Sequence, residues 1–440
     1  MGLRCAGILD PGLGFPGGVT SGFARHKVAP PMRRHLLLSL VPVVLFLTSC
    51  GNKPVAQWLL PTPVMYLDGS VRPFDHLPAS QQSTETEVFY ATNRVRVGTR
   101  YGAGMTKELR FGIARMRMGS EDESWASLVD ASTEHPRQEP MSVRVNEASE
   151  VATESGPNVG GWLRRVDQAV MGTSTRDLVI YVHGAKVGFE HSCAFAAELQ
   201  HFSGRDVVAV AFDWPTHREL VSYVDGVDLR HAQQSSAKLA DLVELLAKGT
   251  RARKIHIVSW SAGARVLSRA LDELGRDRSH SMAKDLRIGA AVFAAGDVPE
   301  RDFQSRLEAI ERVTERVIVY VSDDDFALRW SSRLMGGGRR LGMEWDDFGP
   351  KRMAFLKHHP TLEIVDTSYG KETRGFDIRG HRYWFQHPWV NSDLILALRT
   401  DQPAAKRGLS RGEIEGLFYF ASDYDKKIGG VAKRLTGGAW

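Results

Sequence analysis

The sequence predicts an α/β fold with one doubly wound, mostly parallel sheet of about eight strands. The first observation is a series of short apolar runs, at 178–182, 207–212, 255–258, 288–294, 317–321 and 362–365. Nearly continuous apolar runs of this length are typical of strands buried on both faces of a parallel sheet. The second observation is that helical patterns separate the runs. Leu239, Leu242, Val243 and Leu246, for example, have the i, i+3, i+4, i+7 spacing of one helix face.

Charge excludes one class of function. The 440 residues carry 57 Lys and Arg against 52 Asp and Glu, a formal net charge of +5. Residues 1–49 hold five of the basic residues and one of the acids, so the rest of the chain carries +1 (52 against 51). Bulk charge therefore does not predict nucleic-acid binding.

The N-terminus has the pattern of a secretory signal. A basic start after Met32 precedes an apolar run over 36–47 that is too short to span a membrane comfortably. A Leu-x-Ser-Cys sequence ending at Cys50 resembles the lipobox of bacterial lipoproteins, in which the cysteine is lipidated. We expect residues 1–49 to be a leader and signal peptide, with Met32 as the true start. The alternative is an internal apolar helix with a chance cysteine.

This resemblance implies a lipid anchor on Cys50 and a place in the bacterial cell envelope, at the outer membrane facing the periplasm in a Gram-negative cell. Cys193 is the remaining cysteine downstream, so no disulfide is expected within the mature chain. No Cys or His cluster has metal-ligand spacing. We therefore expect no metal and no other cofactor.

The chain downstream of Cys50 divides into four parts. Residues 50–84 contain five prolines among polar residues and predict a tether. Residues 85–400 form the expected folded domain, which opens with strand-like runs near 87–92 and 109–118. Within it, residues 119–160 are polar and rich in Ser, Glu and Pro, which predicts a long insertion. Residues 401–440 are expected to be a C-terminal extension.

The strongest chemical signal follows the apolar run at 255–258. The sequence Ser259-Trp260-Ser261-Ala262-Gly263 is a Ser-x-Ser-x-Gly variant of the nucleophile elbow, a sharp turn from strand to helix. Such a turn needs small residues two positions before and after the nucleophile, and Ser259 and Gly263 meet this demand. Ser261 is the candidate nucleophile and the Ala262 amide a candidate oxyanion donor. The alternative is a helix N-cap serine, which is common at such junctions.

The run at 178–182 ends in His183-Gly184-Ala185, and a His-Gly turn there is where hydrolases of this type place the loop with the second oxyanion donor. Ala185 is the candidate for that donor. We expect His183 to shape the loop and not to act as the general base.

Two further strand ends supply a carboxylate and a histidine. The run at 317–321 leads into three consecutive acids, Asp323 to Asp325, and chemistry alone does not choose among them. Asp297 is a reserve candidate, and a solvated acidic helix start is the alternative for the three. His381 follows the last run. The chain order serine, acid, histidine is that of an α/β-hydrolase.

Together these segments resemble a bacterial α/β-hydrolase family of esterase- and lipase-like proteins of unknown function, over residues 89–398. The resemblance rests on the segments 89–94, 183–190, 213–216, 259–263, 322–328 and 380–383, and on Tyr223 and Asp225. The family's Ser-x-x-Asp-x-Ala-Leu segment selects Asp325 as the acid. One departure is Ala185-Lys186, where the family commonly has Tyr-Asn. The oxyanion loop of this chain is therefore expected to differ from that of the family.

The resemblance implies a serine hydrolase that cleaves carboxylic esters through an acyl-enzyme, with Ser261 as nucleophile, His381 as base and Asp325 as the residue that orients His381. Its substrate would be a small ester or lipid. A lipid-anchored scaffold or ligand-binding protein without turnover, or an acyltransferase with the same triad, is the alternative. The gap between Asp297 and the run at 317–321, about 20 residues, is too short for a cap domain of ~50 residues. A lid would have to come from 119–160 or 336–338.

Overall fold

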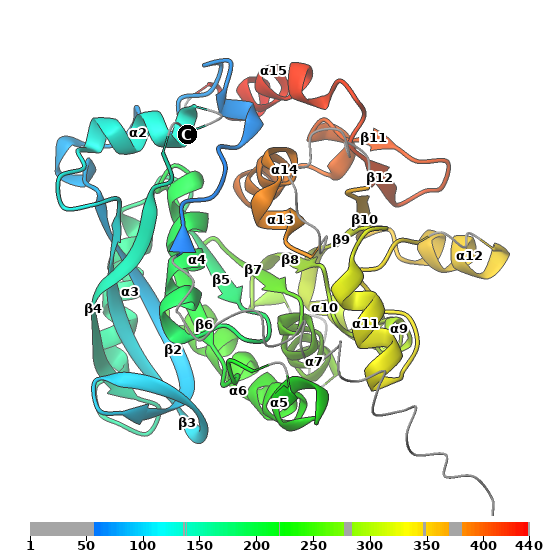
Figure 1. Cartoon of the computed structure of the whole chain (residues 1–440), viewed down its shortest axis with the longest axis horizontal. Helices are drawn as coiled ribbons and strands as arrows, with labels where there is room; N and C mark the ends of the chain where they lie inside the picture. Colours follow the sequence, from blue (N-terminus) through cyan, green and yellow to red (C-terminus); the bar gives the residue numbers. More distant parts are fainter. Residues whose placement is uncertain are drawn as a thin grey trace, which may run out of the picture. The chain divides into compact units, whose positions relative to one another are not determined.

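The central feature of the computed structural model is a mixed sheet, to which the described residues contribute 12 strands in the order β1-β4-β3-β2-β6-β5-β7-β8-β9-β10-β12-β11 (Figure 1). The structure describes residues 57–438, apart from 135–136, 138, 220, 277–283, 346–348 and 369–380. Cys50 and the predicted signal peptide lie outside the described residues.

The middle of the sheet is parallel, and this confirms the predicted fold class. Eight strands of the described residues run parallel to at least one sheet neighbour: β2 (Glu85–Val97), β6 (Val208–Asp213), β5 (Asp177–Val182), β7 (Lys254–Trp260), β8 (Ile288–Ala294), β9 (Thr314–Val321), β10 (Leu362–Asp366) and β12 (Leu417–Tyr419). All six apolar runs of the sequence fall on strands of this group. β1 (Gln57–Trp58), β3 (Arg100–Met118), β4 (Ser142–Thr153) and β11 (Ser410–Arg411) add antiparallel pairs at the two edges.

Helices cover both faces of the parallel strands, because alternate side chains of each strand point to opposite faces. In β5, Val179 and Tyr181 belong to one core cluster, and Leu178, Ile180 and Val182 belong to the other. α4 (Phe189–Phe202), α13 (Tyr383–Gln386) and α14 (Pro388–Arg399) pack in the first cluster. The second contains α3 (Val159–Met171), α6 (Val227–Gly249), α7 (Gly263–Arg276), α9 (Glu300–Gln304), α10 (Leu307–Val313) and α12 (Pro350–His358). α9 and α10 fill the connection from β8 to β9, which holds no cap domain, as the sequence predicts.

The predicted tether is part of the folded body wherever it is described. Leu59, Leu60, Met65, Tyr66 and Val71 are buried in the first core cluster. The amide of Leu60 also donates to the buried carboxylate of Glu198 (2.8 Å). The prediction of a tether is therefore wrong for this stretch, since the apolar side chains between the prolines pack against the body.

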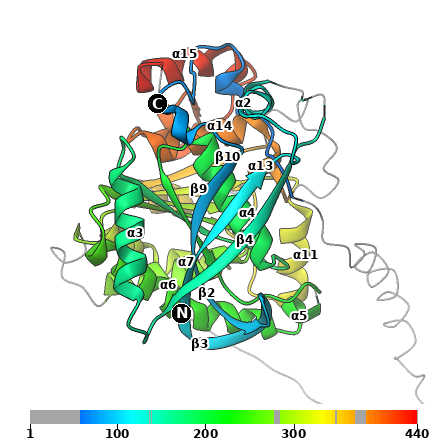
Figure 2. The same ribbon diagram turned by 90° about the vertical axis from the view of Figure 1, so that its left-hand side faces the viewer.

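Residues 119–160 are also not a simple insertion. They supply α2 (Trp125–Thr133) and the strand β4, which pairs antiparallel with β3 at the edge of the sheet (Figure 2). Only Val143 and Ala152 of β4 are buried, so its sequence lacks the apolar run of an interior strand. β4 lies five positions from β7 in the sheet, about 24 Å at ~4.8 Å per strand. This position removes β4 from the candidate lids.

The C-terminal residues complete the sheet and cannot be described as a mere extension. β12 pairs with β10, and α15 (Tyr424–Thr436) buries Tyr424 and Ile428 in the first core cluster. The guanidinium of Arg407, which is fully buried, pairs with Asp393 (2.8 Å) and Glu363 (2.9 Å). Residues 401–438 are thus tied to β10 and α14 by hydrogen bonds, ion pairs and apolar contacts.

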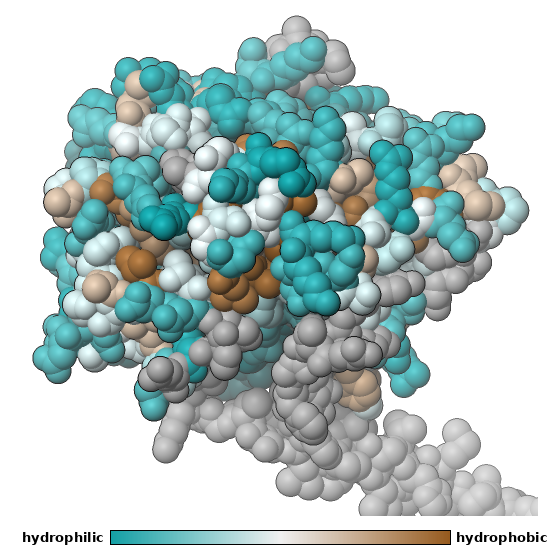
Figure 3. Space-filling view, turned by 90° about the horizontal axis from the view of Figure 1, so that it is seen from above, coloured by the Kyte–Doolittle hydropathy of each residue, from teal (hydrophilic) through white to brown (hydrophobic). Residues whose placement is uncertain are grey.

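Hydrophilic residues predominate on the face in Figure 3, and hydrophobic ones form small separate groups there. Among the helices of the described residues, none combines the length and the apolar character needed to cross a membrane.

Candidate active site

Ser261 lies at the sharp turn between β7 and α7, with a backbone φ of 52°. Only a few per cent of non-glycine residues adopt a positive φ, and such strain is concentrated at functional sites. A Cβ atom on Gly263 would lie 2.4 Å from the carbonyl oxygen of Val182, so only glycine fits there. Ser259 is buried, and its hydroxyl donates to the carbonyl of Val292 (2.9 Å). This hydrogen bond explains how the turn accepts serine in place of the commoner glycine.

The structure brings Ser261, His381 and Asp325 together in one hydrogen-bonded chain. The distance from Ser261 Oγ to His381 Nε2 is 2.8 Å. His381 Nδ1 lies 2.8 Å from Oδ2 and 3.0 Å from Oδ1 of Asp325. Since a carboxylate only accepts, Nδ1 carries the proton and Nε2 is left to accept from the serine hydroxyl. These are the contacts and the tautomer of a Ser-His-Asp triad.

The other candidate acids, Asp297 and Asp324, lie in different surroundings. Asp297 is buried and pairs with Arg340 (2.8 Å), and its carboxylate also accepts from Ser331 and Tyr223. The backbone amide of Asp297 donates to the carbonyl of Ser261 (2.9 Å), so Asp297 stabilises the turn that carries Ser261. Asp324 is exposed. Asp325 contacts His381, and its carboxylate also caps α11 (Phe326–Met335) by accepting from the Leu328 amide (2.9 Å).

Burial raises the pKa of the Asp325 carboxyl above its ordinary value, while His381 and the Leu328 amide oppose the rise. The Asp325 side chain is 0% exposed, whereas His381 keeps 15% of its side-chain surface in contact with solvent. A desolvated carboxylate at Nδ1 favours a positive charge on the imidazole. The pair is therefore suited to a base that takes up a proton at Nε2.

Aromatic residues hold the His381 segment in place. The indole N–H of Trp260 donates to the carbonyl of His381 (3.3 Å), and the two rings lie 5.6 Å apart. Tyr383 joins the segment to two strand ends, since its hydroxyl donates to the carbonyl of Tyr320 (2.7 Å) and accepts from the amide of Ala295 (2.9 Å). Tyr383 is thus a positioning residue for His381.

Replacing Tyr383 by phenylalanine is expected to lower the free energy of unfolding by about 1–3 kcal/mol, because two buried backbone groups lose their partner. It should also lower kcat, since His381 is held less firmly. Urea unfolding and ester kinetics measure the two effects. Tyr424→Phe is the matched control: its buried hydroxyl has no hydrogen-bond partner in the described part of the chain. Equal stability of the two variants would contradict the assigned role.

The loop after β5 lies against the nucleophile. A Cβ on Gly184 would lie 3.0 Å from the Cβ of Ser261, so glycine permits the close approach. Ala185 follows it, and Lys186 has a φ of 64°, a conformation in which asparagine is more common than lysine. His183 is fully buried beneath the loop, where its Nδ1 donates to the carbonyl of Gly184 (2.7 Å) and its ring stacks on Trp214. His183 therefore shapes the loop and does not reach Ser261.

A buried ion pair that the sequence analysis did not single out supports this loop. Arg94 Nε lies 2.7 Å from Oδ2 of Asp213, and both side chains are almost completely buried. A second nitrogen of Arg94 donates to the carbonyl of Val187 (2.8 Å), just after Lys186. Burial opposes ionisation of Asp213, but Arg94 and His183 outweigh it and hold the pKa of this carboxyl below its ordinary value. Arg94 and Asp213 both lie in segments that carry the family resemblance, which was the available signal.

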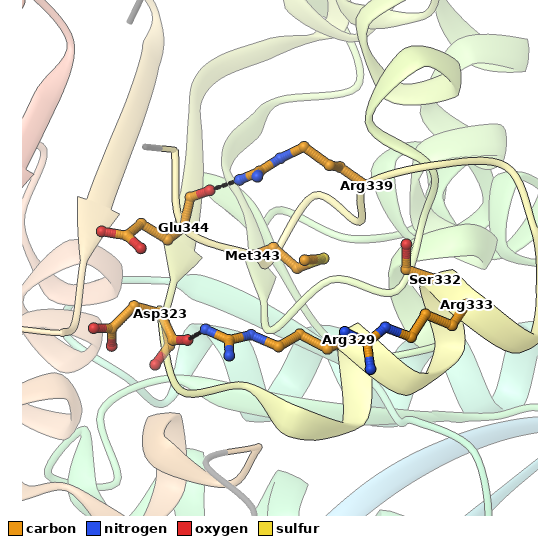
Figure 4. A pocket seen from close by; sticks show the side chains of 8 residues that line it. Asp323, Arg329, Ser332, Arg333, Arg339, Met343 and Glu344 are labelled. Atoms are coloured by element: carbon orange, nitrogen blue, oxygen red, sulfur yellow. Dashed lines mark hydrogen bonds between the residues drawn. The ribbon is translucent and has the colours of Figure 1, made fainter. Parts of the chain in front are cut away.

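A cavity of about 330 Å³ lies beside the turn that carries the acid (Figure 4). It is lined by Ser322, Asp323, Arg329, Ser332, Arg333, Arg339, Met343 and Glu344, and none of the triad side chains lines it. Arg329 donates to the backbone carbonyl of Asp323, and Arg339 donates to that of Glu344. These hydrogen bonds fix the positions of two basic side chains that line the cavity. The cavity therefore lies next to the segment that carries Asp325.

One group in the described part of the chain has metal-ligand character, namely His217, Asp228 and His231. None of the triad residues belongs to it.

One comparison with known proteins, that with family models, agrees with this architecture. Residues 163–398 match a family model described as an alpha/beta hydrolase of unknown function (DUF900), and this range includes all three triad residues. Among solved structures, Trichoderma reesei cutinase in complex with a C11Y4 phosphonate inhibitor is 15% identical, with a TM-score of 0.24 over 42% of this chain and 78% of that chain. No curated protein gives a significant match. Since the family model covers more than half of the 440 residues, the chain belongs to the DUF900 family of α/β-hydrolases of unknown function.

Proposed function

We propose that the protein is a serine hydrolase that cleaves carboxylic esters through an acyl-enzyme. The observation that carries the proposal is the continuous chain from Ser261 Oγ through His381 to Asp325, on a strained turn that directs the serine out of the sheet. A helix N-cap serine, the alternative for Ser261, requires neither the histidine nor the buried acid behind it.

In the proposed reaction Ser261 Oγ attacks the ester carbonyl carbon while His381 Nε2 takes the hydroxyl proton. Asp325 stays ionised and holds Nδ1–H, so the imidazolium is stabilised as it forms. The amides of Ala262 and Ala185 donate to the oxyanion, and loss of one such donor typically costs ~3–4 kcal/mol of transition-state stabilisation. The tetrahedral intermediate then collapses, and the leaving alcohol takes the proton from His381. Water then attacks the acyl-enzyme in the same way, with His381 taking its proton. Collapse of this second intermediate releases the carboxylic acid and returns the proton to Ser261.

Kinetics on a short-chain nitrophenyl ester test the proposal. The wild type is expected to turn over the dissolved ester, with no sharp rise in rate at the solubility limit, because the β8–β9 connection holds no cap. Ser261→Ala should lose the activity by at least about 10³-fold. Equal rates for the two proteins would contradict the proposal and favour a scaffold or ligand-binding role. Added alcohol distinguishes acyl transfer, since a transferase would yield a new ester in place of the acid.

We also propose that Cys50 carries a lipid that anchors the chain to the bacterial cell envelope. The support is the signal pattern of the sequence, a basic start, a short apolar run and Leu-x-Ser-Cys. The lipid on Cys50 would keep the hydrolase body at the membrane surface.

Expression of Cys50→Ser in a bacterium is expected to move the protein from the membrane fraction to the soluble fraction, because the modified thiol is gone. Detergent-phase partitioning and the mass of the N-terminal peptide measure the change. Cys193→Ala, which removes the buried free cysteine, should leave the fractionation unchanged. A wild-type N-terminus upstream of Cys50 would contradict the anchor.

A further inference from the structure

A second polar cluster lies on the loop after β6 and on the first turns of α6. It consists of His217, Asp228 and His231, whose possible ligand atoms all lie within 4.8 Å of one another. His217 Nδ1 is 2.8 Å from Oδ1 of Asp228, and the two imidazole rings stack with centroids 5.8 Å apart. Asp228 and His231 are three positions apart on α6, so they project from the same helix face.

Asp228 is a buried carboxylate, and in the described part of the chain no permanent cation is paired with its charge. Its side chain is 0% exposed, and its partners in the described part of the chain are the ring and the backbone amide of His217. No Arg or Lys of that part pairs with it, although Arg230 lies nearby on the same helix. Burial of a carboxylate is costly unless a positive charge or strong hydrogen bonds compensate for it. A cation between Asp228 and the histidines would supply that charge.

One ring nitrogen of His231 is held by a backbone carbonyl. Its Nδ1 donates to the carbonyl oxygen of Pro215 (3.2 Å), which leaves Nε2 as the nitrogen with a free lone pair. A backbone carbonyl on the other ring nitrogen is a common way to fix the orientation of a ligating imidazole.

We propose that His217, Asp228 and His231 form a binding site for Zn²⁺. Two imidazoles and one carboxylate are a common three-ligand zinc set, with the fourth position open to water. Ligands of a tetrahedral zinc ion lie about 3.4 Å apart, given bonds of ~2.05 Å. The cluster therefore needs only small side-chain rotations, and the metal takes the place of the proton shared by His217 and Asp228.

The role of the metal follows from where the cluster lies. His217 comes directly after Thr216 and three residues after Trp214. Trp214 donates to the carbonyl of His183 (2.7 Å), and Thr216 donates to the carbonyl of Val187 (2.8 Å). These two carbonyls lie at the two ends of the candidate oxyanion loop. Zinc would tie this segment to α6 and so stabilise the support of that loop. It would not touch the triad, and the inference does not depend on the proposed hydrolase activity.

Calorimetric titration of the full-length protein with ZnCl₂, after removal of metal with EDTA, tests the site. We expect one equivalent to bind and the thermal unfolding temperature to rise with zinc. His217→Ala and His231→Ala should each weaken the binding by at least about 10-fold. Because His231 lies partly at the surface, its variant is expected to fold even where Asp228→Asn does not.

Two histidine variants serve as controls. His358→Ala removes an exposed imidazole, and His381→Ala removes another imidazole that is paired with a buried carboxylate, that of Asp325. Both should bind zinc like the wild type. The proposal is overturned if the wild type shows no saturable binding, if the affinity survives in both His217→Ala and His231→Ala, or if His381→Ala abolishes it.

Discussion

The Asp325→Asn variant is expected to lose about 10⁴-fold in kcat while it keeps its fold. An asparagine can present its N–H₂ to His381 Nδ1, which then carries no proton and leaves the proton on Nε2. In that tautomer the imidazole cannot accept from Ser261. Steady-state kinetics on a short ester measure the loss.

The same variant should be no less stable than the wild type at neutral pH. Because burial raises the pKa of Asp325 in the folded chain, the native state binds more protons than the unfolded state between the ordinary and the raised pKa. Ionisation of Asp325 therefore lowers the free energy of unfolding as the pH rises through that window. A neutral asparagine does not ionise, so the variant avoids this decrease. Asp324→Asn, one residue away and exposed, should leave both rate and stability unchanged. More than a tenth of the wild-type kcat in Asp325→Asn would show that Asp325 is not the triad acid.

The Arg94→Met variant is expected to lower the free energy of unfolding by about 3–5 kcal/mol, because it leaves Asp213 charged and buried without its partner. Without the Arg94 charge, which lowers the pKa of Asp213 in the wild type, this pKa is higher in the variant. The loss of stability relative to the wild type should therefore shrink as the pH falls and the carboxyl protonates. Urea unfolding at several pH values measures both effects.

Two further variants make this test specific. Arg94→Met combined with Asp213→Asn removes the unpaired charge and should recover part of the lost stability. Arg96→Met changes a neighbouring arginine that is 43% exposed and should stay within about 0.5 kcal/mol of the wild type. If the double variant is no more stable than Arg94→Met, the loss does not come from the buried charge of Asp213.

The sequence predicts the interior of this fold well and its edges poorly. The interior strands are buried on both faces, and their residues are almost all apolar, so the chain marks them directly. β4 lies at the edge with most of its side chains partly exposed, and its polar sequence resembles a loop. The N-terminal segment resembles a tether because its apolar residues have no helical or strand periodicity. Its burial depends on partners such as α4 and α14, which lie far along the chain.

The candidate site likewise contains some residues that the sequence predicts and others that it does not. Ser261, Asp325 and His381 are predictable because each follows an apolar strand in a fixed chain order. The Arg94–Asp213 pair is not, since 119 residues separate its members and each is an ordinary charged residue by itself. The same holds for His217, whose distance from Asp228 is set by the loop after β6. Such pairs become visible only when the fold brings them together.

Reaction with a fluorophosphonate probe tests the central claim, that Ser261 is an activated nucleophile. Intact-mass measurement should show one probe per wild-type chain, and peptide mapping should place it on Ser261. The Ser261→Ala variant should remain unlabelled, and His381→Ala should react far more slowly, since the base that activates the serine is missing. A folded wild-type protein that takes up no probe, or a Ser261→Ala variant that is labelled as fast as the wild type, would contradict the account.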